Sequence, residues 1–289
     1  PSAQINDGHA WGNPRAQNPA YRRASHFYSS PKAVMSNLTS SDGFEQPVVH
    51  ETASAKSMVF SDIDIQSRMS LARPDELQFE YTRLMMGVLL FHPQPQSILM
   101  VGLGGGSLAK FCYKHLPHAH ITVVEINPHV IALRHSFCIP DDDARFRVVQ
   151  MDAAEYMAHT EQKFDVVFAD GFDQHGLPEQ LCSTQFYDDC RRVLTSGGVT
   201  VVNLHRFSAF RDVYVDRIES VFEGALWVVN APGTTNCVVF AINALTKDLK
   251  LTFGKHKPVH MSDEAWLQIS PSVARVFLAT QASMQDAHL

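Results

Sequence analysis

Apolar and polar residues alternate in blocks along the middle of the chain. Five short apolar runs are each followed by a stretch whose apolar residues recur at helical spacing, a pattern typical of parallel strands separated by helices. The runs are SILMVGL, HITVVEI, FRVVQMD, FDVVFAD and GVTVVNL, and the helical stretches lie near residues 107–116, 128–137, 153–159 and 184–194. The pattern predicts an α/β fold with a doubly wound, mostly parallel sheet.

The segments on either side of this repeat follow other patterns. Short β-like runs over residues 47–73 predict a small antiparallel β layer, and residues 75–91 have helical spacing behind Pro74. Late in the chain, ALWVVNA and NCVVFAIN are joined by the turn PGTTN, which predicts an antiparallel hairpin. A terminal hairpin of this kind is typical of the class I methyltransferase fold, so we expect a seven-stranded sheet. The stretch from about Ser262 is expected to be helical.

These patterns predict three segments. Residues 1–44 are rich in Ser, Asn, Pro, Ala and Gly without a sustained period, as expected for a flexible tail. Residues 45–92 are expected to form the small β layer and a gate helix. Residues 93–289 are expected to form a Rossmann-like, nucleoside-binding catalytic domain.

Composition narrows the functional classes. The net charge of −6 and the pI of about 6.2 give no overall basic field, so we expect no nucleic-acid partner. The five cysteines show neither C-x-x-C spacing nor a Cys/His metal pattern, which predicts reduced thiols, a cytoplasmic location and no metal. No apolar run approaches the roughly 20 residues that span a bilayer, so no membrane association is expected.

The glycine-rich segment ILMVGLGGGSLAKF carries the strongest local signal. A predicted strand runs into Gly102, Gly104, Gly105 and Gly106 before a predicted helix. Glycines let the backbone approach a ligand closely, and a helix start offers free N–H groups. The segment therefore predicts a cofactor cradle. The dinucleotide fingerprint G-x-G-x-x-G/A would place its third small residue at Ser107, so this mismatch and the hairpin disfavour an NAD-dependent oxidoreductase.

Acidic residues end the next two predicted strands. Glu125 closes the strand in VVEIN, where a carboxylate can accept both hydroxyls of a ribose. Asp152 in VVQMDAAEY is placed to accept the exocyclic amine of adenine, with the Ala153 N–H facing a ring nitrogen. For both acids, plain solvation at a strand end is the alternative.

A fourth strand ends in Asp170-Gly171-Phe172-Asp173. Two carboxylates three residues apart at the carboxyl edge of a sheet can both face the ligand crevice. Their repulsion would raise one pKa and leave a proton acceptor, and their charge would attract a cationic amine. Helix capping by one and solvent exposure of the other is the alternative. His175, in the same loop, is a further candidate base or ligand.

Taken together, the run from about Val48 to Asn203 resembles the spermidine synthase family of aminopropyltransferases. GLGGGS, VVEIN, MDAAEY, FADGFD and TQFYDDCRRVLTSGGVTVVN occur in the family's order and approximate spacing, after IDIQSRM and FEYTRLMM. The resemblance implies that Gln66 and Tyr81 border the sulfonium co-substrate, Glu125 binds its ribose and Asp152 its adenine. It further implies a small-molecule amine held by Asp170 and Asp173, with Asp173 as general base, and a homodimer.

Two positions depart from the family pattern. The family's glycine loop reads G-G-G-D-G-G, and we place the position of its aspartate at Gly104; the histidine that usually follows the gate tyrosine is Thr82. In the family, the loop aspartate lies beside the aminopropyl amine of decarboxylated S-adenosylmethionine and would repel the carboxylate of S-adenosylmethionine itself.

The resemblance and these departures together leave two enzymatic hypotheses. The first is transfer of an aminopropyl group from decarboxylated S-adenosylmethionine to a polyamine. The alternative is methyl transfer from S-adenosylmethionine to a protein or a small molecule. A ligand sensor or scaffold without turnover is a third reading.

Overall fold

The computed structural model describes residues 43–60, 65–172, 176–244 and 257–286. Its first element is a small antiparallel sheet in the order β1-β2-β3. The strands are β1 (Val48–Glu51), β2 (Ala55–Val59) and β3 (Ile65–Ser70). This sheet confirms the predicted N-terminal β layer.

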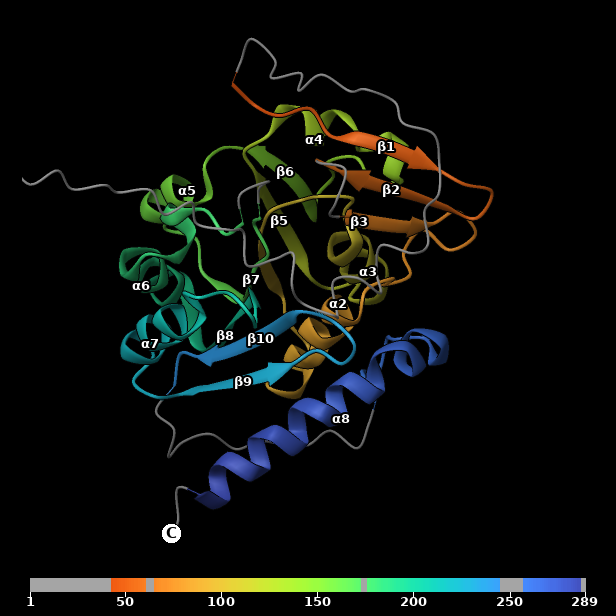
Figure 1. Cartoon of the computed structure of the whole chain (residues 1–289). Coiled ribbons are helices and arrows are strands. Elements are labelled where there is room, and N and C mark those ends of the chain that lie inside the picture. The colour runs from red at the N-terminus through yellow and green to blue at the C-terminus, as the bar shows by residue number, and fades with distance from the viewer. Residues whose placement is uncertain (1–42, 61–64, 173–175, 245–256, 287–289) are drawn as a thin grey trace, which may run out of the picture. The chain divides into compact units, whose positions relative to one another are not determined.

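The main sheet has seven strands in the order β6-β5-β4-β7-β8-β10-β9 (Figure 1). The first five along the chain run parallel, and β10 is antiparallel to both β8 and β9. The seven strands are β4 (Ser97–Val101), β5 (His120–Glu125), β6 (Phe146–Gln150), β7 (Phe164–Ala169), β8 (Leu194–His205), β9 (Leu226–Asn230) and β10 (Asn236–Ile242). The predicted fold class is confirmed. Strand order reverses at β4, and ligands of such sheets bind beside the reversal point at the carboxyl ends of the strands.

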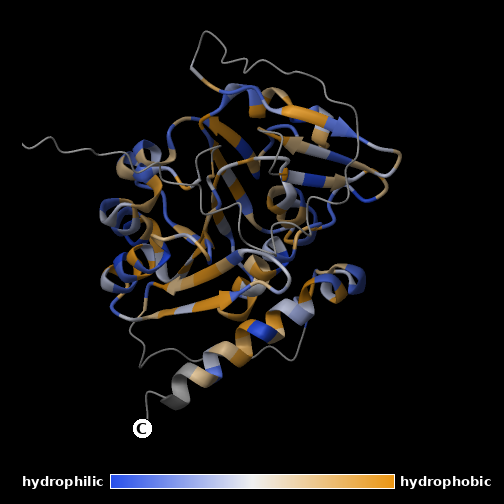
Figure 2. Ribbon diagram, in the orientation of Figure 1, coloured by the Kyte–Doolittle hydropathy of each residue, from blue (hydrophilic) through white to orange (hydrophobic). Residues whose placement is uncertain are grey.

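Helices cover both faces of the main sheet. One face packs against α5 (Ala153–His159), α6 (Thr184–Val193) and α7 (Arg211–Val221), and the other against α2 (Glu80–Met85), α3 (Ser107–His115) and α8 (Asp263–Asp286). The strands of the main sheet consist mostly of hydrophobic residues, whereas the helices beside them contain both hydrophilic and hydrophobic residues (Figure 2). Each face thus encloses its own apolar core. Among the described residues, no helix combines the length and the apolar character that crossing a membrane would need.

Two predicted helices are shorter than expected. The helix expected over residues 75–91 begins at Glu80 and continues as the 3-10 helix η3 (Met86–Leu90). Residues before it are held by tertiary contacts instead: the Asp75 carboxylate accepts hydrogen bonds from Lys114 and His115, and the Leu77 N–H donates to Gln268.

The second shortened helix is the one expected over residues 128–137. It divides into α4 (Pro128–Ala132) and the 3-10 helix η4 (His135–Phe137). The ammonium groups of Lys56 and Lys110 donate to carbonyl oxygens of η4 and hold this turn in place.

Candidate active site

The glycine loop between β4 and α3 passes through three left-handed backbone conformations. Gly102, Gly104 and Gly106 have φ values of +91°, +49° and +67°. A Cβ atom at Gly102 would lie 2.7 Å from the carbonyl oxygen of Asp170, and one at Gly106 would lie 2.5 Å from Ile139. Glycine is therefore required at both positions by conformation and by space. The loop brings the end of β4 against the end of β7, beside the reversal point of the sheet.

Strand β3 lies over this loop. A Cβ atom at Gly105 would stand 2.4 Å from the Ser67 hydroxyl oxygen, whereas one at Gly104 would meet only the Ser67 Cβ, at 3.9 Å. Matching G-G-G-D-G-G to GLGGGS from Gly102 puts the family's aspartate at Gly105, so our placement at Gly104 is one residue too early. The loop still contains no acidic residue. The space beside Gly105 is filled by Ser67, a buried residue that the sequence reasoning missed.

Glu125, at the end of β5, lies beneath the loop with only 9% of its surface exposed. Its two carboxylate oxygens accept hydrogen bonds from the N–H groups of Leu103 and Asn127, both at 2.8 Å. Burial raises the pKa of Glu125, and these backbone donors act in the opposite direction. The structure thus shows Glu125 holding the glycine loop. Contact with a ribose stays a prediction.

Asp152 begins helix α5 as its N-cap. One carboxylate oxygen accepts hydrogen bonds from the N–H groups of Ala154 at 2.7 Å and Glu155 at 3.2 Å. The other oxygen lies 3.4 Å from the amide nitrogen of Gln180. Capping, which the sequence reasoning weighed for the Asp170/Asp173 pair, is therefore an observed role of Asp152. Adenine binding by Asp152 and Ala153 stays a prediction.

Two apolar side chains stand open to solvent next to these acids. Ile126 follows Glu125 and is 41% exposed, and Met151 precedes Asp152 and is 39% exposed. Small-molecule sites are lined mainly by apolar side chains with a few polar groups among them. The sequence carried a signal for both residues, since each adjoins a motif acid, but the reasoning passed over them.

Asp170 is the centre of a polar network at the end of β7. Its carboxylate accepts a hydrogen bond from the Asn203 amide at 2.8 Å and another from the Tyr81 hydroxyl. Burial raises the pKa of Asp170 to about 6, although both hydrogen bonds act to lower it. The same burial and the Asp170 charge raise the pKa of Tyr81 well above its usual value. A carboxylate with this pKa can exchange a proton near neutral pH.

Of the remaining residues singled out from the sequence, some lie outside the described part of the chain and others can be placed in it. Asp173 and His175 lie outside the described residues. Gln66 is half-buried on β3 next to Ser67, and Thr82 is buried, with its hydroxyl donating to the carbonyl of Phe79. The structure thus brings four predicted site residues together. Gly102 lies against the backbone of Asp170, Glu125 accepts a hydrogen bond from the glycine loop, and Tyr81 donates a hydrogen bond to Asp170.

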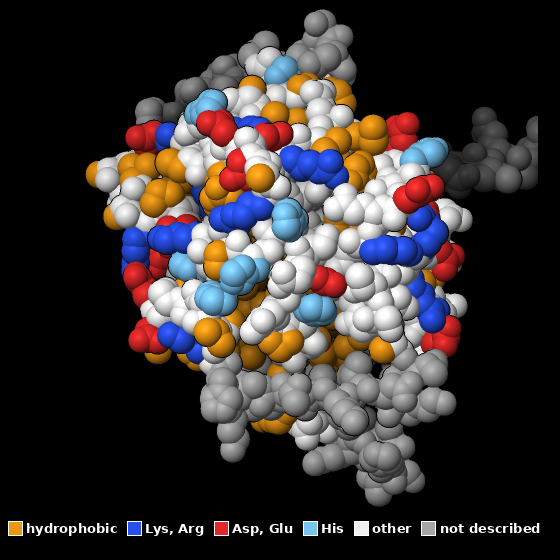
Figure 3. Space-filling view, turned by 180° about the vertical axis from the view of Figure 1, so that it is seen from behind, with side chains coloured by type: hydrophobic (Ala, Val, Ile, Leu, Met, Phe, Trp, Pro, Cys, Tyr) orange, Lys and Arg blue, Asp and Glu red, His pale blue; other side chains and the backbone are white. Residues whose placement is uncertain are grey.

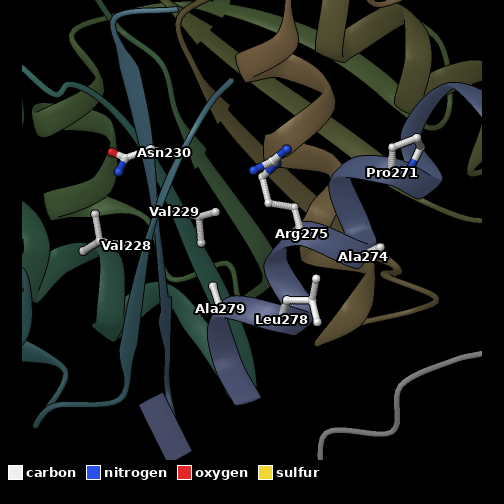
Figure 4. Close-up of a pocket in the computed structure, with 8 residues that line it drawn as sticks. All are labelled: Val228, Val229, Asn230, Pro271, Ala274, Arg275, Leu278 and Ala279. Atoms are coloured by element: carbon white, nitrogen blue, oxygen red, sulfur yellow. The ribbon is translucent and has the colours of Figure 1, made fainter. Parts of the chain in front are cut away.

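The surface has two other features. A cavity of about 470 Å³ lies between β9 and α8 and is lined by none of the predicted site residues (Figure 4). On the face seen in Figure 3, acidic and basic side chains are interspersed. In the described part of the chain, no group of three or more His, Cys, Asp or Glu residues is arranged to hold a metal ion.

Comparison with known sequences identifies the family to which the chain belongs. The family model of the spermine/spermidine synthase domain matches residues 78–221. A polyamine aminopropyltransferase of Neisseria meningitidis serogroup A is 32% identical over 249 residues, which cover 86% of this chain and 95% of that protein. The chain belongs to the polyamine aminopropyltransferase family. A second member, from Chromobacterium violaceum, is 35% identical over 71% of this chain and 77% of its own.

Solved structures agree with the fold. A probable spermidine synthase from Corynebacterium glutamicum superimposes with a TM-score of 0.62 at 19% identity, covering 79% of this chain and 91% of that one. A spermidine synthase in complex with the transition state analogue AdoDATO gives a TM-score of 0.52 at 18% identity, covering 78% and 89%. At these identities the comparison supports the fold alone.

Proposed function

We propose that this protein transfers the aminopropyl group of decarboxylated S-adenosylmethionine to a small-molecule amine, as a polyamine aminopropyltransferase. The main support is its identity to named aminopropyltransferases over almost the whole length of one of them. The site agrees with this chemistry, because a glycine loop and a half-buried carboxylate meet at the reversal point of the sheet.

The donor would occupy the β4–β5–β6 side of the site. In this proposal, Glu125 binds the ribose while it holds the loop, and Asp152 and the Ala153 N–H bind the adenine. Ile126 and Met151 would contact the faces or edges of the ring. The glycine loop, including Gly104 and Gly105, together with Gln66 and Tyr81, would border the sulfonium end.

The acceptor would lie beside Asp170 and Asp173. The nitrogen lone pair of a neutral amine attacks the methylene carbon attached to sulfur, the C–S bond breaks, and its electron pair stays on sulfur as methylthioadenosine leaves. The new C–N bond creates an ammonium, whose proton passes to a carboxylate. We propose Asp173 as this general base and Asp170 as the group that binds and orients the amine. Orientation of the two substrates would supply most of the acceleration.

Methyl transfer from S-adenosylmethionine is the second candidate function. It is favoured by one observation: no acidic side chain stands in the glycine loop, and the neutral Ser67 hydroxyl fills the space beside Gly105. A donor carboxylate would meet no repulsion from the loop itself. Under this alternative the amine or another acceptor attacks the methyl carbon, and S-adenosylhomocysteine leaves.

Calorimetric titration distinguishes the two candidates. The purified protein is titrated with methylthioadenosine, decarboxylated S-adenosylmethionine and S-adenosylmethionine under the same conditions. Aminopropyl transfer predicts that the decarboxylated donor binds at least as tightly as the intact one. Much tighter binding of S-adenosylmethionine would overturn the proposal in favour of methyl transfer.

A further inference from the structure

A line of three side chains joins the terminal hairpin to Asp170. The Asn236 amide nitrogen donates to the Asn203 side-chain oxygen at 3.0 Å, and the Asn203 amide nitrogen donates to Asp170 at 2.8 Å. We propose that Asn236 is a positioning residue for group transfer: it fixes the orientation of the Asn203 amide so that a donor faces Asp170. This inference rests on the proposed function and adds a residue outside the motifs that led to it.

The direction of these hydrogen bonds is dictated by chemistry. An ionised carboxylate only accepts hydrogen bonds, so the Asn203 amide must turn its nitrogen toward Asp170. Its oxygen then points the other way and requires a donor, which Asn236 supplies. Without that donor, the Asn203 oxygen would be left unpaired at a residue only 2% exposed. Rotation of the amide would then bring an oxygen toward the Asp170 carboxylate and disfavour its charge.

The position of Asn236 suits a positioning role. It is the first residue of β10, and β10 runs antiparallel to β8, where Asn236 lies opposite His205 and Val238 opposite Asn203. The Asn236 N–H donates to the Thr234 hydroxyl, so the turn before β10 helps to hold its backbone. Asn236 therefore acts on Asp170 through Asn203. The terminal hairpin, predicted as a feature of the fold, in this way becomes part of the site.

Among the described residues, two side chains donate hydrogen bonds to the Asp170 carboxylate. Tyr81 faces it from α2 and Asn203 from β8. The glycine loop approaches the Asp170 backbone at Gly102, and Phe172 packs against the His205 ring with centroids 4.9 Å apart. Because Asn203 is one of only two described donors, its orientation has a direct effect on the charge of Asp170. Loss of the donor raises the pKa of this carboxyl.

The test compares Asn236→Ala, Asn203→Ala and the double variant with the unmodified protein. Transfer rates are measured from pH 5.5 to 9 with decarboxylated S-adenosylmethionine and a diamine, and the Asp170 carboxyl is titrated by carbon-13 NMR. Asn230→Ala is the matched control, since Asn230 is an exposed residue at the end of the neighbouring strand β9. Thermal unfolding of every variant is recorded alongside.

We expect Asn236→Ala to lower kcat roughly 3- to 10-fold at pH 6.5, the size expected for loss of one hydrogen bond in a network, and less than about 2-fold at pH 8.5. The Asp170 titration should move to higher pH. In the Asn203→Ala background, Asn236→Ala should add almost nothing, because the two residues act in series. Asn230→Ala should change neither rate nor titration.

Two results would overturn the inference. One is an equal fall in rate at every pH with an unmoved Asp170 titration, which would indicate a structural role. The other is full additivity of the two substitutions. Absence of turnover in the unmodified protein would instead overturn the proposed function, and the NMR titration would still decide the role of Asn236.

Discussion

Replacing Glu125 by alanine separates the two roles assigned to this carboxylate. The structure shows it pairing the N–H groups of Leu103 and Asn127 at 2.8 Å, and the proposal gives it the donor ribose as well. Each hydrogen bond to a charged group contributes about 1.5–3 kcal/mol, and relief from burying the carboxylate offsets part of the loss. We therefore expect Glu125→Ala to lower the free energy of unfolding by about 2–4 kcal/mol.

The assay pairs chemical denaturation with calorimetric titration of methylthioadenosine. Both stability and binding should fall, and Glu161→Ala, at an exposed glutamate, should change stability by less than about 0.5 kcal/mol. The pKa of Glu125 is raised in the folded state, so its contribution to stability is greatest at low pH and declines as pH rises through that pKa. The stability gap should thus be wider at pH 4.5 than at pH 8. Lost binding with unchanged stability would refute the loop-holding role.

Three further predictions concern other parts of the site and the thiols. The kcat/KM profile should have an acidic limb near the pKa of about 6 of Asp170, and Tyr81→Phe should move that limb to higher pH by removing a donor to the carboxylate; a limb near pH 4 would contradict this. Asp152→Ala should lower unfolding free energy by about 0.5–2 kcal/mol through loss of the α5 cap, whereas Asp152→Ser should keep most of the stability and still weaken donor binding. Maleimide should label Cys138 rapidly in the native protein because it is the exposed thiol among four buried ones; mass spectrometry finding another cysteine labelled first would oppose this.

Much of the fold could be predicted from local sequence patterns. Helix α5 has the predicted bounds, and the side chain of Asp152 caps its first turn. The terminal hairpin was predicted because PGTTN separates two apolar runs. By contrast, the predicted start of α2 at residue 75 was wrong. Asp75 and Leu77 instead form hydrogen bonds with residues distant in the sequence, and the helix begins only at Glu80.

Only those site residues that belong to a recognisable sequence motif could be predicted from the sequence. Glu125 ends an apolar strand and Asp170 directly follows one, and both were found in that way. Ser67, Asn203 and Asn236 are neutral residues within or at the end of strands, and their roles depend on strand pairing that the sequence does not state. An amide that interrupts the apolar run VTVVNL was the available signal for Asn203. The cytoplasmic location and the homodimer stay predictions.

Product analysis tests the central proposal most directly. The protein is incubated with a diamine and either decarboxylated or intact S-adenosylmethionine, and the products are identified by mass spectrometry. The proposal predicts methylthioadenosine and an aminopropylated amine from the decarboxylated donor, in equal amounts. Formation of S-adenosylhomocysteine and a methylated product from the intact donor, with no reaction of the decarboxylated one, would contradict it.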